Sequence, residues 1–225
     1  MEASALVIAL DGPSGSGKSS VARAVAEALS LRYLDTGAMY RAVTWWMLRH
    51  DVDVTDPDTV AALADKPQLA MGTDPATPAV HVDGLDASVP IRTREVSNAV
   101  SAVSAVPDVR RRMVAMQVEI IDGGGIVVEG RDIGTVVAPS APVKVFLTAT
   151  PEERAQRRTR DFSAEPASGD VTHAEMQRRD QLDSGRTVSP LAKAEDAVVV
   201  DSTTLAFDEV VDAVLRLVRE PTGAV

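Results

Sequence analysis

The chain has 225 residues and no cysteine, and its 23 basic and 33 acidic side chains give a formal net charge of −10. This length predicts one domain with an insertion, or two small ones, and the lack of cysteine excludes disulfides, thiolate nucleophiles and zinc–cysteine sites. The negative charge argues against nucleic acid or an anionic membrane surface as a partner.

No apolar run reaches the roughly 20 residues of a membrane span, and the first four residues lack the basic head of a secretory signal. We therefore expect a cytoplasmic protein that does not enter a membrane. The three histidines are scattered along the chain, so any metal is expected to be held by oxygen.

The first part of the chain alternates apolar runs with helical spacing. It predicts strands at 5–10 and 32–34, a glycine-rich loop at 12–20, and helices at 21–29 and 38–48. Between 63 and 92 the pattern changes, because four prolines interrupt the chain and Val80 and Val82 alternate with polar neighbours. Asp83-Gly84 is typical of a hairpin turn, so 63–92 is predicted to be a small β-rich insertion outside the main sheet.

The remaining elements follow the same alternation. They are predicted as helices at 93–105 and 108–121, strands at 126–128, 143–147 and 198–200, a helix from Pro151 through an arginine cluster, a loop at 163–170, a helix into Arg178-Arg179 and a last helix from Phe207 to Val218. Short, almost wholly apolar strands separated by helices favour a parallel sheet covered on both faces. The predicted class is therefore α/β.

The loop at 12–20 matches the pattern G-x-x-x-x-G-K-[ST] through Gly12, Gly17, Lys18 and Ser19. In such a P-loop, successive N–H groups surround a β-phosphate, the lysine bridges the transferred phosphate and the serine hydroxyl binds Mg²⁺. The expected ATP-binding residues are Gly12, Pro13, Ser14, Gly15, Ser16, Gly17, Lys18, Ser19 and Ser20.

A P-loop alone does not name a reaction. A GTP switch would carry an Asn-Lys-x-Asp base reader, but the chain's single asparagine, Asn98, is followed by Ala99. A small kinase that also holds a phosphate acceptor is therefore the favoured interpretation.

Five segments extend this interpretation over nearly the whole chain: GPSGSGKSS, LDTGAMYRA, IRTREVSNAVS, VEGRDIGTVV and RRDQLDSGRTVSPL. In this order they resemble the bacterial cytidylate (CMP) kinases, of the nucleoside monophosphate kinase group. The resemblance implies transfer of the γ-phosphate of ATP to CMP or dCMP with Mg²⁺. It also implies a three-layer P-loop kinase fold with a monophosphate-side insertion at 63–92 and a mobile helical lid at 154–180.

The resemblance further implies roles for individual residues. The acceptor phosphate would meet Arg41, Arg131 and Arg186, with Thr36 in the acceptor loop, and the lid would contribute Arg157 and Arg158. The base would meet Asp132, Arg110 and Ser101, and the ribose would meet Asp183, with Arg179 and Tyr40 nearby. Lys18, Arg131, Arg157, Arg158 and Arg186 would be the catalytic residues.

The chemistry of the residues agrees with this reading. An attacking phosphate oxygen is already ionised at neutral pH, so arginines that gather and neutralise two polyanions replace a general base. Cytosine presents an N4 amino donor where uracil presents an oxygen, so a carboxylate such as Asp132 would attract the first and repel the second. Asp132 or Glu129 could instead serve a metal, and Asp35 and Glu129 are candidates for carboxylates just outside the direct ligands of Mg²⁺.

The sequence departs from the family pattern at a few positions. Thr36 stands where some relatives have serine, which keeps the hydroxyl, while Gly185 and the loop at 163–169 are less typical. Two classes of alternative remain: another small-molecule kinase, for UMP, dTMP or shikimate, and a nucleotide sensor without catalysis. A monomer is expected, since no long apolar face is left over.

Overall fold

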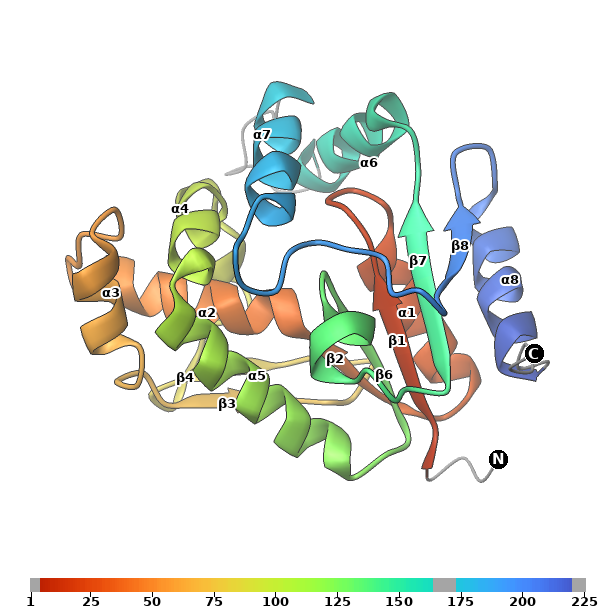
Figure 1. The fold of residues 1–225 in the computed structure, drawn as a ribbon, viewed down its shortest axis with the longest axis horizontal. Coiled ribbons are helices and arrows are strands. Elements are labelled where there is room, and N and C mark those ends of the chain that lie inside the picture. The colour runs from red at the N-terminus through yellow and green to blue at the C-terminus, as the bar shows by residue number, and fades with distance from the viewer. Residues whose placement is uncertain (1–4, 164–172, 220–225) are drawn as a thin grey trace.

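The computed structural model describes residues 5–163 and 173–219, and the predicted loop at 163–170 lies outside these residues except for its first position. Its centre is a five-stranded sheet in the order β2-β6-β1-β7-β8, with all neighbouring strands parallel (Figure 1). The strands are β1 (Val7–Asp11), β2 (Arg32–Asp35), β6 (Ile126–Gly130), β7 (Val143–Thr148) and β8 (Val198–Asp201). The predicted parallel sheet is confirmed.

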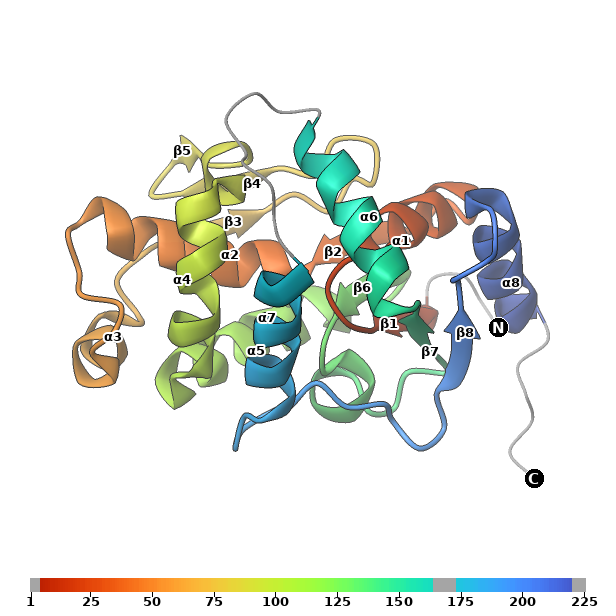
Figure 2. The same cartoon turned by 90° about the horizontal axis from the view of Figure 1, so that it is seen from above.

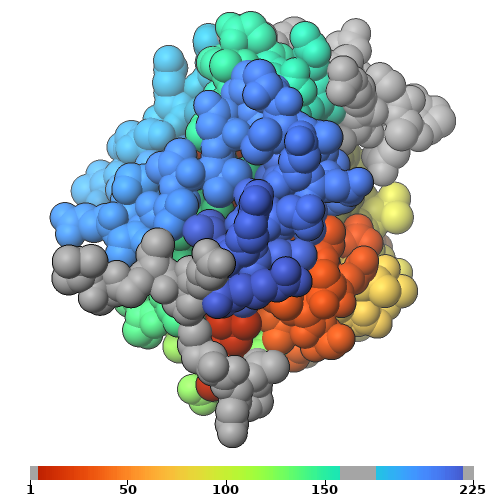
Figure 3. All heavy atoms as spheres, turned by 90° about the vertical axis from the view of Figure 1, so that its right-hand side faces the viewer, coloured from red at the N-terminus to blue at the C-terminus, as the bar shows by residue number. Residues whose placement is uncertain are grey.

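Helices cover both faces of this sheet, and the alternation of side chains along β1 shows how. Ile8 and Leu10 face α1 and α8, whereas Ala9 faces the layer of α2, α4 and α5. The helices are α1 (Lys18–Ala28), α2 (Thr36–Arg49), α3 (Pro57–Leu63), α4 (Arg94–Ala105), α5 (Pro107–Asp122), α6 (Pro151–Ser163), α7 (His173–Ser184) and α8 (Phe207–Arg219). Figure 3 shows α8, in dark blue, on the outer surface of the first of these layers. Among the described helices, none combines the length and the apolar character that crossing a bilayer demands.

The segment 63–92 forms a separate antiparallel sheet, as predicted, from β3 (Leu69–Met71), β4 (Val80–Val82) and β5 (Leu85–Asp86). Asp83 and Gly84, with φ of 52° and 79°, make the turn between β4 and β5. The small sheet packs on α2, and a short 3₁₀ turn, η2 (Pro90–Arg92), leads from it into α4 (Figure 2).

Besides the 3₁₀ turn η2, two elements escaped the sequence analysis. Helix α3 is short, and Asp56 caps it by accepting the N–H of Asp58 at 3.2 Å. A single turn of π-helix, η3 (Ile133–Val137), follows β6 directly. Helices α6 and α7 lie over the carboxyl ends of β1 and β7 (Figure 1), which is the edge where ligands bind in parallel sheets.

The buried sheet predicts a matched pair of stability effects. Leu147 in β7 is 0% exposed and Leu85 in the small sheet is 50% exposed. Leu147→Ala is expected to lower the free energy of unfolding by about 2–5 kcal/mol, because it leaves a cavity in the core. Leu85→Ala should change it by less than about 0.5 kcal/mol. Urea denaturation of both variants measures the difference, and equal losses would contradict the assignment of this core.

Candidate active site

The loop between β1 and α1 is closely packed backbone that only glycine permits. Gly12, Gly15 and Gly17 have φ of 152°, 73° and 90°, values that other residues rarely adopt. A Cβ at Gly12 would lie 2.0 Å from the carbonyl oxygen of Leu147, and one at Gly15 would lie 2.6 Å from that of Arg154. The loop therefore exposes main-chain N–H groups at the start of α1, an arrangement suited to anions.

Lys18, the first residue of α1, carries a cation that is poorly solvated. Its Nζ donates to the carbonyl oxygen of Pro13 at 2.8 Å. Burial is the main reason that the pKa of Lys18 falls from 10.5 to about 7, and Arg131 acts in the same direction against Glu129 and Asp11. Additional negative charge at this place would restore the proton.

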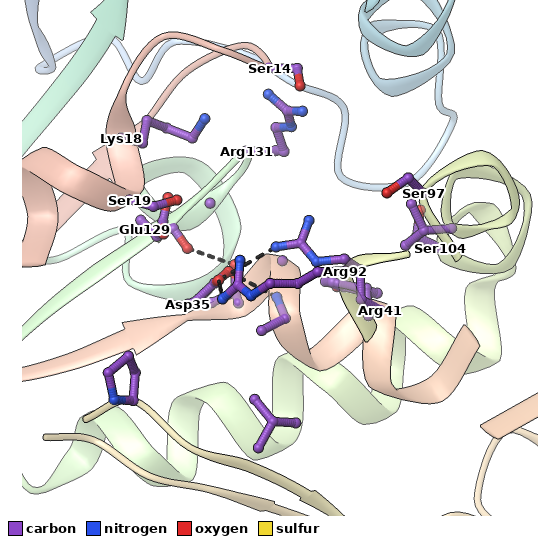
Figure 4. Close-up of a pocket in the computed structure, with 18 of the residues that line it drawn as sticks. Ser14, Lys18, Ser19, Asp35, Arg41, Arg92, Ser97, Ser104, Glu129 and Arg131 are labelled. Carbon is purple, nitrogen blue, oxygen red and sulfur yellow. Dashed lines mark hydrogen bonds and ion pairs between the residues drawn. The ribbon is translucent and has the colours of Figure 1, made fainter. Parts of the chain in front are cut away.

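A cavity of about 480 Å³ opens beside this loop (Figure 4). Residues predicted for the site line it from several elements: Ser14, Gly15, Lys18, Ser19, Ser20, Asp35, Thr36, Tyr40, Arg41, Arg110, Glu129, Arg131, Asp132, Arg179, Asp183 and Arg186. Figure 4 shows Lys18 and Arg131 near the loop, and Ser97 and Ser104 on α4 at another wall.

Several predicted residues do not line this cavity. They include four residues of the loop, Gly12, Pro13, Ser16 and Gly17, of which Ser16 and Gly17 line the second cavity described below. Ser101 is buried but does not line this cavity, and its carbonyl accepts the hydroxyl of Ser104 at 3.3 Å. Ser97 and Ser104, on the same helix, reach the cavity instead. Arg157 lines a second cavity, described below, and the side chain of Arg158 lies outside the described residues.

One wall of the cavity holds a buried ion pair. The Nη2 of Arg110 donates to Oδ2 of Asp132 at 2.6 Å, and its Nη1 donates to the carbonyl of Ser104 at 3.1 Å. The Arg110 guanidinium also lies over the Tyr40 ring, 5.1 Å from its centroid. Burial raises the pKa of Asp132, while Arg110 opposes the rise. A guanidinium and a carboxylate thus stand side by side, able to offer a donor and an acceptor to one planar ligand.

A second carboxylate, Asp183 of α7, holds two arginines. Arg131 Nε lies 3.1 Å from its Oδ2, and Arg186 pairs with its Oδ1. Arg186 also donates to the hydroxyl of Ser104 at 2.8 Å. Asp183 thereby links α7 to the end of β6 and brings both guanidinium groups to the cavity.

Asp35, at the end of β2, holds another pair. It caps α2 by accepting the N–H of Ala38 at 2.8 Å, and its Oδ2 lies 3.4 Å from Arg41 and 3.7 Å from Arg92 (Figure 4). Arg92 lines the cavity but was not predicted for the site, because it sits in a short 3₁₀ turn without a spacing signal. The Asp35 carboxylate therefore holds both guanidinium groups at this wall of the cavity.

Several guanidinium atoms in this cavity retain capacity for a ligand. The Nε atoms of Arg41, Arg110 and Arg186 and the hydroxyl of Ser97 are buried, and they have no hydrogen-bond partner among the described residues. Buried polar groups in proteins are rarely left in this state. The cavity is thus built for a polar, anionic molecule.

The oxygen atoms of Ser19 and Glu129, which line the cavity with Lys18, suit a hard cation. Glu129 accepts a hydrogen bond from the Tyr33 hydroxyl at 2.5 Å, and burial and then Asp35 raise the pKa of Glu129, whereas Lys18 and Ser19 lower it. Within the described residues, no three His, Cys, Asp or Glu side chains gather into a metal cage. A hydroxyl and one carboxylate fit Mg²⁺, which keeps most of its water and is usually completed by substrate phosphates.

The second cavity, of about 350 Å³, lies behind the loop. Gly15, Ser16, Gly17 and Ser20 line it together with an apolar wall of Val21, Leu205, Phe207 and Val210. Arg157 also lines this cavity, and it is fixed by Glu153 at 3.0 Å, by the Ser202 hydroxyl at 2.8 Å and by the Ser202 carbonyl at 2.7 Å. A planar group could lie between the guanidinium and the apolar side chains.

Helices α6 and α7 hold the loop through two residues that the sequence analysis did not select. The Ser14 N–H donates to Asp180 at 3.1 Å, and Arg154 donates to the Ser14 carbonyl at 2.9 Å and pairs with Asp180. Arg154 belongs to the predicted arginine cluster. Its contacts with Ser14 and Asp180 could not be predicted, because both partners are far from it in the sequence.

Comparison with known proteins agrees with this geometry. A family model described as Cytidylate kinase matches residues 8–220. A cytidylate kinase of Streptomyces griseus subsp. griseus is 55% identical over 218 residues, which are 96% of this chain and 94% of the relative. One of Streptomyces avermitilis is 52% identical over 222 residues, 98% and 95% of the two chains. A solved gluconokinase from Sinorhizobium meliloti shares the fold, with a TM-score of 0.50 at 18% identity over 98% of this chain and 95% of that chain. With a family model and relatives of this identity covering nearly its whole length, the chain belongs to the cytidylate kinase family.

Proposed function

We propose that this chain transfers the γ-phosphoryl group of ATP to CMP or dCMP and releases ADP with CDP or dCDP. The observation that carries the proposal is a P-loop lysine that shares one cavity with the buried Arg110–Asp132 pair. The names of the relatives point to the same acceptor. Coupled ADP release tested with CMP, dCMP, UMP, dTMP and shikimate discriminates this reaction from other small-molecule kinases. Absence of any turnover would favour a nucleotide sensor.

On the donor side, the adenosine of ATP would occupy the second cavity, between Arg157 and the apolar wall. Its phosphates would then run over Gly15–Ser19 toward Lys18, which would bridge the transferred phosphate. Arg157 and Arg158 would close over the donor as part of a mobile lid at 154–180. Such closure excludes water, which would otherwise compete with the acceptor.

On the acceptor side, Arg41, Arg131 and Arg186 would bind the phosphate of CMP, with Arg92 at the edge of the cavity. Thr36 contributes less directly, because its hydroxyl donates to the Glu129 carbonyl at 2.7 Å. The acceptor oxygen is already ionised, so it can attack the γ-phosphorus in line without a base. The new bond forms as the bond to the ADP leaving group breaks, and the cations balance the charge on the equatorial oxygens.

We assign Ser19 to Mg²⁺, and Glu129 would orient waters around the ion. Asp35, whose carboxylate also holds Arg41 and Arg92, stays a second candidate for this outer role. When bound, the ion would neutralise the donor phosphates.

Base recognition would fall to the Arg110–Asp132 pair. Asp132 would accept from the N4 amino group of cytosine, and Arg110 would donate to N3 or O2. Asp183 would hold the ribose with Arg179, while Tyr40, at once part of the core and of the cavity wall, would support the nucleotide. Ser101 enters this scheme only through its carbonyl bond to Ser104.

For the molecule as a whole we propose one P-loop kinase domain with its monophosphate-side insertion at 63–92. A monomeric, cytoplasmic enzyme without nucleic-acid partners is consistent with the charge of −10.

Lys18→Ala is expected to lower kcat by at least about 100-fold, because it removes the cation that meets charge developing in the transition state. Circular dichroism should show an intact fold. Lys66→Ala, at an exposed lysine, is the matched control and should retain full activity. More than a few per cent of activity in Lys18→Ala would contradict the assigned role.

Asp132→Asn is expected to lower the ratio of kcat/KM for CMP over UMP by about tenfold or more, since an amide no longer repels O4 of uracil. Steady-state assays with both acceptors measure the ratio. Asp108→Asn removes the exposed carboxylate 2.9 Å from Arg111 and should leave the ratio unchanged. Base recognition would have to be assigned to other residues if the ratio persisted in Asp132→Asn.

Arg157→Ala is expected to raise the KM for ATP by about tenfold while the KM for CMP stays within about twofold, because only the donor cavity loses a wall. The exposed Arg111 provides the control substitution Arg111→Ala. An equal rise in both KM values would place Arg157 outside the donor site.

A further inference from the structure

Asp11, the last residue of β1, is a buried carboxylate that lies next to the cavity without lining it. It is 5% exposed, and its two oxygens are taken by main-chain donors. Oδ1 accepts the N–H of Ile133 at 2.9 Å, and Oδ2 accepts the N–H of Gly134 at 2.8 Å. The carboxylate is thus hydrogen-bonded to the main chain of the turn that follows β6.

That turn carries two residues of the proposed reaction, Arg131 and Asp132. Asp132 immediately precedes the π-helical turn η3, and its own side chain caps none of that turn's N–H groups. Asp11 supplies the missing acceptor from a neighbouring strand. It therefore fixes the backbone from which Asp132 reaches Arg110.

A second contact joins the same two segments, from a side chain of the turn to the main chain of the P-loop. The Nη1 of Arg131 donates to the carbonyl of Gly12 at 2.6 Å, and β1 pairs with β6 so that Asp11 stands opposite Gly130. Three hydrogen bonds between side chain and main chain, made by Asp11 and Arg131, therefore join the start of the P-loop to the acceptor-side turn. Both residues lie at the carboxyl ends of adjacent strands.

Burying a charged carboxylate at position 11 costs free energy. Its presence there therefore indicates that the two N–H groups of the turn need two acceptor oxygens. Burial raises the pKa of Asp11 to about 6, and the charge of Asp132 adds to the rise. Asparagine, its isostere, has a single acceptor oxygen and would turn an N–H₂ group toward one of the two N–H donors.

We propose that Asp11 is a positioning residue that sets Arg131 and Asp132 relative to the P-loop, and thereby sets both cytosine selectivity and the alignment of the two phosphates. The inference rests on the proposed CMP kinase activity. Asp11 touches neither substrate and acts through the turn at 130–134.

Asp11→Asn tests the proposal. We expect the CMP over UMP ratio of kcat/KM to fall by about tenfold, as for loss of a hydrogen bond to a charged group. The KM for ATP should stay within about twofold, because Arg154 and Asp180 still hold the loop. A residue that only stabilised the fold would lower the melting temperature and the active fraction without moving the acceptor ratio, and that outcome would overturn the proposal.

The matched control is Asp56→Asn, which weakens a capping carboxylate of α3 far from the cavity. It should lower the melting temperature slightly and leave the acceptor ratio at the wild-type value. Should Asp11→Asn fail to fold, Asp11→Ser is the fallback variant: its shorter hydroxyl no longer reaches both N–H groups, so the ratio is expected to fall by at least as much. An unchanged ratio in Asp11→Ser would then overturn the proposal.

A double variant separates the inference from the proposed function. If Asp11 acts through Asp132, Asp11→Asn with Asp132→Asn should show the same acceptor ratio as Asp132→Asn alone. Additive losses would contradict action through Asp132. If instead the wild-type enzyme did not prefer CMP over UMP, the proposed base recognition itself would fail, which is visible before any variant is made.

Discussion

The chain must keep many positive charges close together inside a folded protein, and the structure meets this constraint by pairing five arginines of the site with three carboxylates. A buried charge without a partner is strongly destabilising. The pairs are Arg110 with Asp132, Arg131 and Arg186 with Asp183, and Arg41 and Arg92 with Asp35. Each guanidinium has five donors, so a paired arginine can still bind a phosphate. The same carboxylates that offset the positive charge thus hold the arginines in place for a polyanion.

The sheet order explains how distant motifs meet. Strand β1, which leads into the P-loop, lies between β6 and β7, and β2 pairs with the other edge of β6. The motifs after β1, β2 and β6 therefore open at the same edge, although they are separated by as many as 119 residues, as in the contact of Arg131 with Gly12. Helix α7 completes the site from above by placing Asp183 on Arg131 and Asp180 on the P-loop.

Local signals in the sequence were enough for most elements and for the phosphate loop. Glycines at 12, 15 and 17 and the apolar strands are features that neighbouring residues reveal. The strand order was beyond reach, because pairing depends on contacts across the chain. Helix α3 and the π-helical turn were missed since each is too short for a periodic pattern.

The site residues divide in the same way. Motif positions such as Lys18, Arg41 and Asp132 could be selected from the sequence, and they do line one cavity. Asp11, Arg154 and Asp180 could not, because each acts on the backbone of a distant segment. Ser101 was selected through the family resemblance, whereas Ser97 and Ser104 of the same helix line the cavity. Only the rotation of α4 about its axis decides which hydroxyl reaches it.

The absence of a side chain at Gly15 limits which substitutions this protein can accept during evolution. A methyl group there would meet both the carbonyl of Arg154 and the end of Met176, 2.6 Å and 2.7 Å away. The helices above the loop therefore rest on the atoms that are expected to surround phosphate. The Met176 side chain could move aside, but the Arg154 carbonyl is main chain and could not, so glycine at position 15 is expected to persist while the walls of the two cavities vary.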